Sequence, residues 1–170
     1  MISVSPARSA EDFEIAARLA RGLADWDIVA VQSYGISAED VVSIFHPGTG
    51  ADILAARFGA TDASFLIARW EGAPAGCAAF SPFDDDTTEI HKFFVDAQFR
   101  GKGIGRALMD IALAEIGKGH RRKVVLHTTP YMESAVAIYE SFGFRPCSRF
   151  RETPEHVRHT DLFMSRSLTA

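Results

Sequence analysis

Residues 100–105 read Arg-Gly-Lys-Gly-Ile-Gly and join an alternating apolar run to a segment with helical spacing. Glycines at alternate positions let the backbone approach a ligand closely and adopt positive φ angles. Apolar residues at the intervals of one helix face follow: Ile104, Leu108, Ile111 and Ala112. A helix should therefore begin within the glycines, and its unpaired amides, together with Arg100, Lys102 and Arg106, would attract an anion. The junction predicts a phosphate or pyrophosphate site.

Spacing separates this interpretation from other glycine-rich loops. A Walker A loop requires Ser or Thr after Gly-Lys, and Gly103 stands there instead. A dinucleotide fingerprint has Gly-x-Gly-x-x-Gly directly after a strand, whereas this chain has Gly-x-Gly-x-Gly after the link 96–101. A glycine-rich turn that caps an ordinary helix stays open on the loop alone. The flanking sequence therefore has to be considered with the loop.

Two ordered motifs flank the loop. The run Glu89-Ile-His-Lys-Phe-Phe-Val95 precedes it, and Ala-Val-Ala-Ile-Tyr-Glu-Ser-Phe-Gly-Phe at 135–144 follows it. Together they resemble the GCN5-related N-acetyltransferase (GNAT) family over residues 65–150. The family's phosphate-loop signature, Gln/Arg-x-x-Gly-x-Gly/Ala, is matched by Arg100, Gly103 and Gly105. Its second signature is matched by Ala135, Tyr139, Gly143 and Phe144.

The resemblance implies one domain, 1–170, with an α+β fold: a mostly antiparallel twisted sheet of about seven strands with about four flanking helices. The sheet would splay to admit the pantetheine arm of acetyl-CoA. The implied function is transfer of an acetyl group from acetyl-CoA to a primary amine through a tetrahedral intermediate. A non-catalytic acyl-CoA sensor of the same fold stays an alternative, as do O-acyl transfer and longer acyl donors. The implied cofactor-binding residues are Phe93, Phe94, Val95, Arg100, Gly101, Lys102, Gly103, Ile104, Gly105 and Arg106.

The resemblance also implies two catalytic residues. Glu89 would take the amine's proton, directly or through a water, and the alternative is a solvated strand end beside the acidic turn 84–86. Tyr139 would donate to the leaving thiolate, since a phenol has a reference pKa of about 10, and the alternative is packing on an apolar helix face. A backbone N–H near Phe93 or Phe94 would stabilise the oxyanion. Met132 stands where many members have asparagine, so an amide contact to the pantetheine arm would be missing.

The elements that must position these residues follow from periodicity and caps. Ser9 with Asp12, and Ser37 with Asp40, predict the starts of two early helices. The loop-capped helix should run to Gly117 and a last helix should end at Gly143. Alternation along 87–95 should put Glu89, His91 and Phe93 on one face. Strands are predicted at 2–4, 65–70, 75–80, 87–95, 123–127, 145–150 and 161–167.

Composition restricts the partners. The 170 residues, 47% of them apolar, suit a single core. Eighteen basic against 22 acidic residues give a net charge of −4, which offers no general attraction for nucleic acid or an anionic membrane. No apolar run reaches the length of a membrane span and the N-terminus lacks the pattern of a signal peptide, so a cytoplasmic location is expected. The expected partner is a small-molecule or peptide amine; a homodimer stays open.

The remaining reactive side chains are predicted to have structural roles or to lie in solvent. Cys77 and Cys147 are expected to be reduced, buried small hydrophobes. His156 and His159 lack a third ligand, so a solvated loop is predicted and no metal. Choice of the acceptor is assigned to residues 26–60 and 151–160. Four aromatic side chains there could line an acceptor pocket or belong to the core: Trp26, Tyr34, Phe45 and Phe58.

Overall fold

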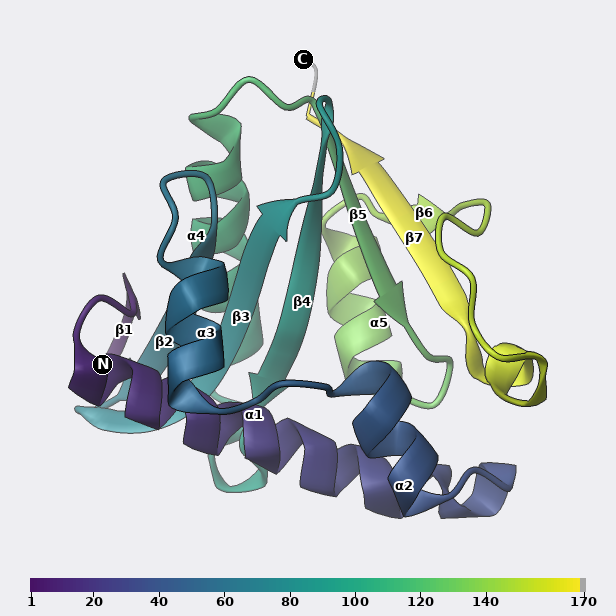
Figure 1. Cartoon of the computed structure of the whole chain (residues 1–170). Coiled ribbons are helices and arrows are strands. Elements are labelled where there is room, and N and C mark those ends of the chain that lie inside the picture. The colour runs from purple at the N-terminus through teal and green to yellow at the C-terminus, as the bar shows by residue number, and fades with distance from the viewer. Residues whose placement is uncertain (169–170) are drawn as a thin grey trace.

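A seven-stranded sheet crosses the protein in the order β1-β2-β3-β4-β5-β7-β6 (Figure 1). The computed structural model describes residues 1–168. Neighbouring strands are antiparallel except β4 and β5, which are parallel. The predicted α+β class and mostly antiparallel sheet are therefore confirmed. The strands are β1 Ile2–Pro6, β2 Ser64–Trp70, β3 Ala73–Pro82, β4 Thr87–Val95, β5 Lys123–Thr128, β6 Arg145–Pro146 and β7 Leu162–Ser167.

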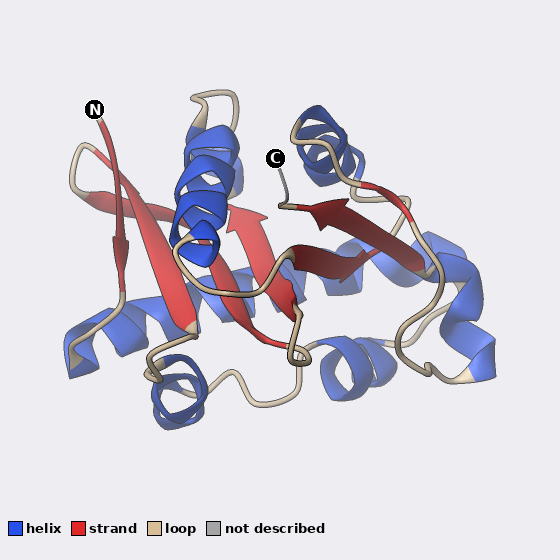
Figure 2. Cartoon of the chain, turned by 90° about the horizontal axis from the view of Figure 1, so that it is seen from above, coloured by secondary structure: helices blue, strands red, loops and turns tan. Residues whose placement is uncertain are grey.

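Helices cover both faces of this sheet (Figure 2). Ser9 and Asp12 form the predicted capping box at the start of α1, where the side chain of each residue accepts from the backbone amide of the other. Ser37 caps α2 through the amide of Asp40 as expected, but the helix continues as a π-helical turn, Val41–Phe45. The α-helices are α1 Ala10–Ala30, α2 Ala38–Asp40, α3 Ala51–Phe58, α4 Ile104–Gly117 and α5 Glu133–Ser141.

Two apolar clusters, one on each face of the sheet, hold these layers together. Helices α4 and α5 pack on one face with Ile90 and Phe93 of β4, and α1 and α3 pack on the other with Phe94. Neighbouring residues of β3 alternate between the clusters: Ala78 joins the first, whereas Cys77 joins the second. The sheet is thus buried from both sides, and its central strand β4 contributes to both layers.

Strand β4 carries a bulge at its middle. Its register with β3 shifts between Cys77 and Ala79, and Lys92 adopts a positive φ of 51°. A bulge inserts one residue, so side chains beyond it exchange faces. Consequently Phe93 packs on the α4 side, whereas His91 lies against the ring of Phe58 on the α3 side. The predicted sharing of one face by Glu89, His91 and Phe93 is therefore wrong beyond His91.

Strands β4 and β5 separate after Ile90 of β4. Their pairing covers Thr87 to Ile90 of β4 and does not extend to the remaining residues of that strand. Figure 1 shows the two strands diverging, with α5 behind the gap. The backbone of residues 91–95 consequently has no β5 partner. This is the splay that the family resemblance implied.

Three segments differ from the sequence-based expectation. Helix α3, 51–58, was not predicted, and it begins at Gly50 without a side-chain cap. The strand predicted over 145–150 is limited to Arg145–Pro146, after which only the Cys147 amide still bonds β7, at the carbonyl of Phe163. His156 and His159 lie on a 3-10 helix, Glu155–Thr160, rather than in a loop. The first two differences bear directly on the site, because they place Arg57 and Arg151.

Candidate active site

Glu89 is a buried carboxylate held by one arginine. Its side chain on β4 is 5% exposed, so the alternative of a solvated strand end is wrong. Arg151 donates from Nη1 to Oε2 at 2.8 Å and from Nη2 to Oε1 at 2.5 Å. This two-point geometry is the strongest form of an arginine–carboxylate contact. It keeps a charged group inside the protein and leaves further lone pairs on both oxygens.

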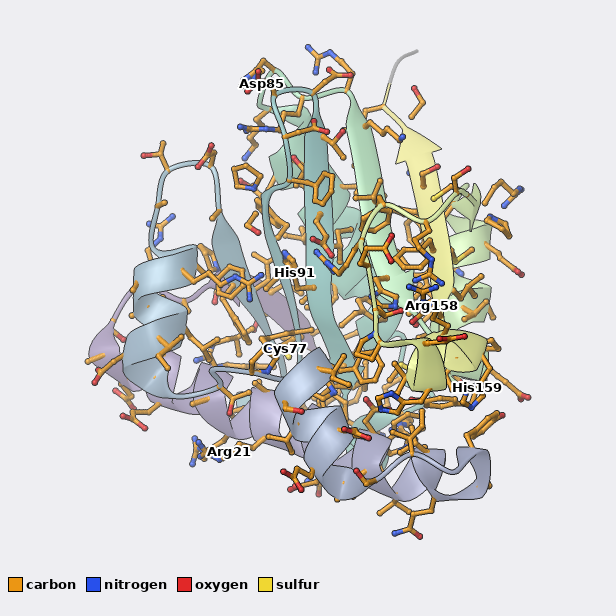
Figure 3. All side chains as sticks on the ribbon, turned by 45° about the vertical axis from the view of Figure 1, so that its right-hand side comes forward. Arg21, Cys77, Asp85, His91, Arg158 and His159 are labelled. Carbon is orange, nitrogen blue, oxygen red and sulfur yellow. The ribbon has the colours of Figure 1, made fainter. Side chains whose placement is uncertain are left out.

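His91 lies beside this pair and is held as a neutral ring. Its Nδ1 is 3.8 Å from Oε2 of Glu89, and its Nε2 is 2.8 Å from Oγ of Ser81. Burial, reinforced by nearby Arg57, Arg151 and Lys92, lowers the pKa of His91 to about 3. A ring with so low a pKa is a weak base, which favours Glu89 over His91 as the proton acceptor. Figure 3 shows His91 on the sheet, with Arg158 and His159 on the C-terminal 3-10 helix to one side.

A cavity of about 330 Å³ opens beside Glu89 and also reaches Tyr139. The Tyr139 ring on α5 packs edge-on to Phe93 at 5.3 Å and to Phe144 at 6.2 Å between centroids. Burial raises the pKa of Tyr139, so its phenol stays protonated. The structure therefore places the two sequence-predicted catalytic residues around one cavity. Phe45 of the predicted acceptor segment lines it as well.

The glycine loop borders a second cavity of about 470 Å³. Gly103 has a φ of 83° and is the N-cap of α4, a left-handed conformation that favours glycine. The helix start leaves the amides of 104–106 without partners inside the helix. Nine of the ten predicted cofactor-binding residues line this cavity. The tenth, Lys102, lies outside the lining with its ammonium 4.8 Å from the centre of the Trp70 ring.

The loop's two arginines are fixed by their own contacts. Arg100 donates from Nε to the Val95 carbonyl at 3.2 Å, and its guanidinium lies over the Trp26 ring. Arg106 donates from Nη1 to Oγ of Ser141 at 3.2 Å. Both retain free donors at the mouth of the amide-lined helix start. Helix dipole, exposed amides and two guanidinium groups together suit a pyrophosphate.

The two cavities adjoin, because Leu23, Phe93 and Met132 line both of them. Glu89 and Tyr139 line the first of the two. Met132, at the position where the family often has asparagine, contributes a thioether at this junction and no amide.

The other residues singled out in the sequence have structural partners. His156 Nε2 is 3.1 Å from Oδ2 of Asp40, and His159 Nε2 is 3.0 Å from the Tyr34 carbonyl. Cys77 is buried as predicted, and burial raises the pKa of its thiol to about 12; Cys147 is only half-buried. Among residues 1–168 there is no cluster of His, Cys, Asp or Glu suited to a metal ion. No helix in the same range has the length and apolarity needed to cross a bilayer.

Sequence reasoning missed Arg151, Arg57 and Lys92 as site residues. Each lines the cavity beside Glu89. Arg151 comes from an irregular segment 62 positions from its partner, a separation that no local pattern reveals. The positive φ of Lys92 depends on the bulge, and the alternation of residues along β4 does not predict a bulge.

Residues 34–144 match the acetyltransferase (GNAT) family, and the chain belongs to that family. The N-acetylaspartate synthetase of Danio rerio is 38% identical over 108 residues, which are 63% of this chain and 37% of that protein. The mycothiol acetyltransferase of Corynebacterium efficiens is 33% identical over 96 residues, 56% of this chain and 31% of that one. The chain thus spans about a third of the length of these two relatives.

A solved structure with the same fold is that of PaiA N-acetyltransferase from Thermoplasma acidophilum in complex with coenzyme A. The two superpose with a TM-score of 0.73 at 18% identity, over 98% of this chain and 99% of that one. At this identity the likeness establishes the arrangement of the elements.

Proposed function

We propose that the protein transfers an acetyl group from acetyl-CoA to a primary amine. The observation that carries this proposal is the junction of the two cavities at Phe93 and Met132. On one side lies an anion-binding helix start, and on the other a buried carboxylate and a protonated phenol. This arrangement supplies a place for a phosphate-bearing acyl donor, a proton acceptor and a proton donor within one continuous site.

The glycine loop would hold the pyrophosphate of acetyl-CoA. The amides of 104–106 and the guanidinium groups of Arg100 and Arg106 supply the donors. The pantetheine arm carries amides, and β4 offers unpaired backbone groups over 91–95 where β5 has separated from it. An extended chain pairs with such an edge as an added strand does. The thioester, which is the group that acetyl-CoA supplies, would then lie beside Phe93.

Glu89 would receive the proton of the attacking amine. Arg151 occupies one lone pair on each oxygen of the carboxylate, so a water or the amine can bond another. Transfer through a bridging water accommodates this contact, because a water relays the proton without displacing Arg151.

The bulge would supply the donor for the oxyanion, and Tyr139 would supply the proton for the leaving thiolate. The bulge removes Lys92 and Phe93 from the regular ladder with β3, which frees backbone donors beside the splay for the oxyanion. Tyr139, kept protonated by burial, would donate to the departing thiolate. Both groups sit on packed elements rather than mobile loops, so the geometry is preorganised.

The acceptor is an amine on a small molecule or a peptide. Two of the relatives are named an N-acetylaspartate synthetase and a mycothiol acetyltransferase. Both names point to small acceptors. The 330 Å³ cavity beside Glu89 is at the small end of the usual range for ligand sites, which agrees with an acceptor of that size.

Binding of acetyl-CoA to the glycine loop is tested by thermal unfolding. A ligand that binds only the folded state stabilises it by about 2.7 kcal/mol at 100 times its Kd, so saturating acetyl-CoA should raise Tm by roughly 5–10 °C. Gly103→Val forces a β-branched residue into a φ of 83° and should abolish the shift. Gly72→Val is the matched control, because Gly72 has a φ of 87° in the β2–β3 turn, outside both cavities. An undiminished shift in folded Gly103→Val would place the phosphates elsewhere.

A further inference from the structure

Six formally charged residues line the cavity beside Glu89, and the three acids all have partners. Glu89 is bound by Arg151, and Glu152 accepts from Arg158 at 2.8 Å. Asp27 accepts from Tyr131 at 2.6 Å and lies 2.8 Å from Nε2 of His46. The lining cations other than Arg151 are Arg57 and Lys92. Within residues 1–168 neither of these two forms an ion pair with a carboxylate.

The charge of Arg57 acts on Lys92 as a like charge. Partial burial, followed by the charge of Arg57, lowers the pKa of Lys92. Partial burial also lowers the pKa of Arg57. The negative charge of Glu89 raises that pKa, and the positive charge of Arg151 lowers it. Nη2 of Arg57 lies 3.5 Å from Nε2 of His91, and that ring is neutral. The cavity therefore holds two cations, Arg57 and Lys92, that form no ion pair with the carboxylates of its lining.

A strained backbone position holds Lys92 beside the cavity, and packing of α3 holds Arg57 there. Lys92 is the non-glycine residue at the β4 bulge with a φ of 51°. All five residues 89–93 of β4 line this cavity, and Lys92 reaches it from the bulge. Arg57 is held from the other side by α3, where the neighbouring Phe58 is only 2% exposed and its ring lies 5.0 Å from the guanidinium. Strain at such a position is a reason to look for a ligand.

We propose that the acceptor amine carries a carboxylate, which binds Arg57 and Lys92 while its amine faces Glu89. This inference rests on the proposed N-acetyl transfer and names its substrate class: amino carboxylates such as amino acids. Guanidinium and ammonium groups are the side chains that bind carboxylates most strongly. A bound carboxylate would neutralise the pair, while the ammonium of the same molecule would be drawn to Glu89, which lines the same cavity. A polyamine would instead bring further positive charge to two cations that lack an ion-pair partner.

The first arm of the test compares acceptors that differ only in the carboxylate. With acetyl-CoA, β-alanine and L-aspartate should show kcat/KM values at least about tenfold above those of their amides, the size of one charged hydrogen bond. Arg57→Gln and Lys92→Met should each reduce this preference by roughly tenfold. Arg21→Gln and Lys118→Met are matched controls that should preserve it, because Arg21 points away from α1 (Figure 3) and the Lys118 side chain is 70% exposed.

The second arm does not depend on acetyl transfer. Succinate, which has no amine, is titrated into the protein without acetyl-CoA by calorimetry, and saturable binding that weakens about tenfold in Arg57→Gln supports the carboxylate site. If no amine is acetylated but this binding is found, the proposed function fails and the site stands. If transfer occurs but prefers the amides or putrescine, or if succinate binds equally in wild type and Arg57→Gln, the carboxylate site is overturned and the transfer function stands.

Discussion

Replacing Arg151 by methionine should expose the cost of an unpaired buried carboxylate. Charge centres about 4 Å apart interact by about 4 kcal/mol at an effective dielectric constant of 20. The Arg151 side chain is 39% exposed, so solvent screening reduces this value, and we expect Arg151→Met to lower the free energy of unfolding by about 1–3 kcal/mol at pH 7. The Glu89 side chain is only 5% exposed and cannot replace the lost partner with bulk water.

The dependence on pH and on Glu89 identifies the cause. Because protonation removes the orphaned charge, the loss in Arg151→Met should shrink toward pH 5. Glu89→Gln removes the charge altogether, so the double variant should be more stable than the sum of the single effects predicts, with a coupling of about 1–3 kcal/mol. Arg158→Met is the control, because its partner Glu152 is 83% exposed and such surface pairs contribute about 0–1 kcal/mol.

The measurement is urea unfolding of the four proteins of this cycle at pH 7 and pH 5. The slopes should agree within error, so that midpoints report stability. Additive single effects at pH 7, or a loss in Arg151→Met that is the same at both pH values, would refute the reasoning. In that case Glu89 would not depend on Arg151 for its charge.

Three further outcomes follow from other parts of the site. Tyr139→Phe keeps the packed ring and removes the hydroxyl, so turnover should fall tenfold to a thousandfold with a change of less than about 1 kcal/mol in stability; unchanged turnover would leave Tyr139 a packing residue. His91 titrates near pH 3 when folded and near 6.5 when unfolded, so it contributes stability above pH 6.5 that is lost as the pH falls toward 3, with a slope of at most about 1.4 kcal/mol per pH unit. His91→Gln should flatten the decline between pH 6 and 4 in urea titrations, and an identical decline would contradict the assignment. A thiol reagent should modify Cys147 but not Cys77 in the folded protein, because burial holds the Cys77 thiol protonated; fast reaction of both cysteines would show that the core around Cys77 opens.

The sequence predicted the elements whose signals are local. Ser9 and Asp12 stand three positions apart and form their capping box within one turn. The glycine loop and the helix after it were predictable for the same reason, since the left-handed Gly103 and the apolar face of α4 belong to adjacent residues. The antiparallel strands β2, β3 and β4 are joined by short turns, so their order followed from their succession along the chain.

The parts that could not be predicted depend on distant contacts. Helix α3 has no side-chain cap, and it is placed by packing against α1. The segment after β6 alternates like a strand but does not continue to pair with β7. The side chains of Arg149 and Arg151 bind the buried carboxylates of Asp161 and Glu89. The choice of these partners is made by burial of the acids, which only the assembled sheet determines. Sequence therefore located Glu89 and missed what holds it.

Acetyl transfer itself tests the central claim most directly. The purified protein is mixed with acetyl-CoA and a set of amines that includes amino acids, amides and putrescine, and the acetylated product is identified by mass spectrometry while free thiol is counted. We expect one thiol released per acetylated amine, with Glu89→Gln slower by about tenfold to ten-thousandfold near neutral pH although it still binds acetyl-CoA. Thiol release without an acetylated amine, or full activity in Glu89→Gln, would contradict transfer at the junction of the two cavities.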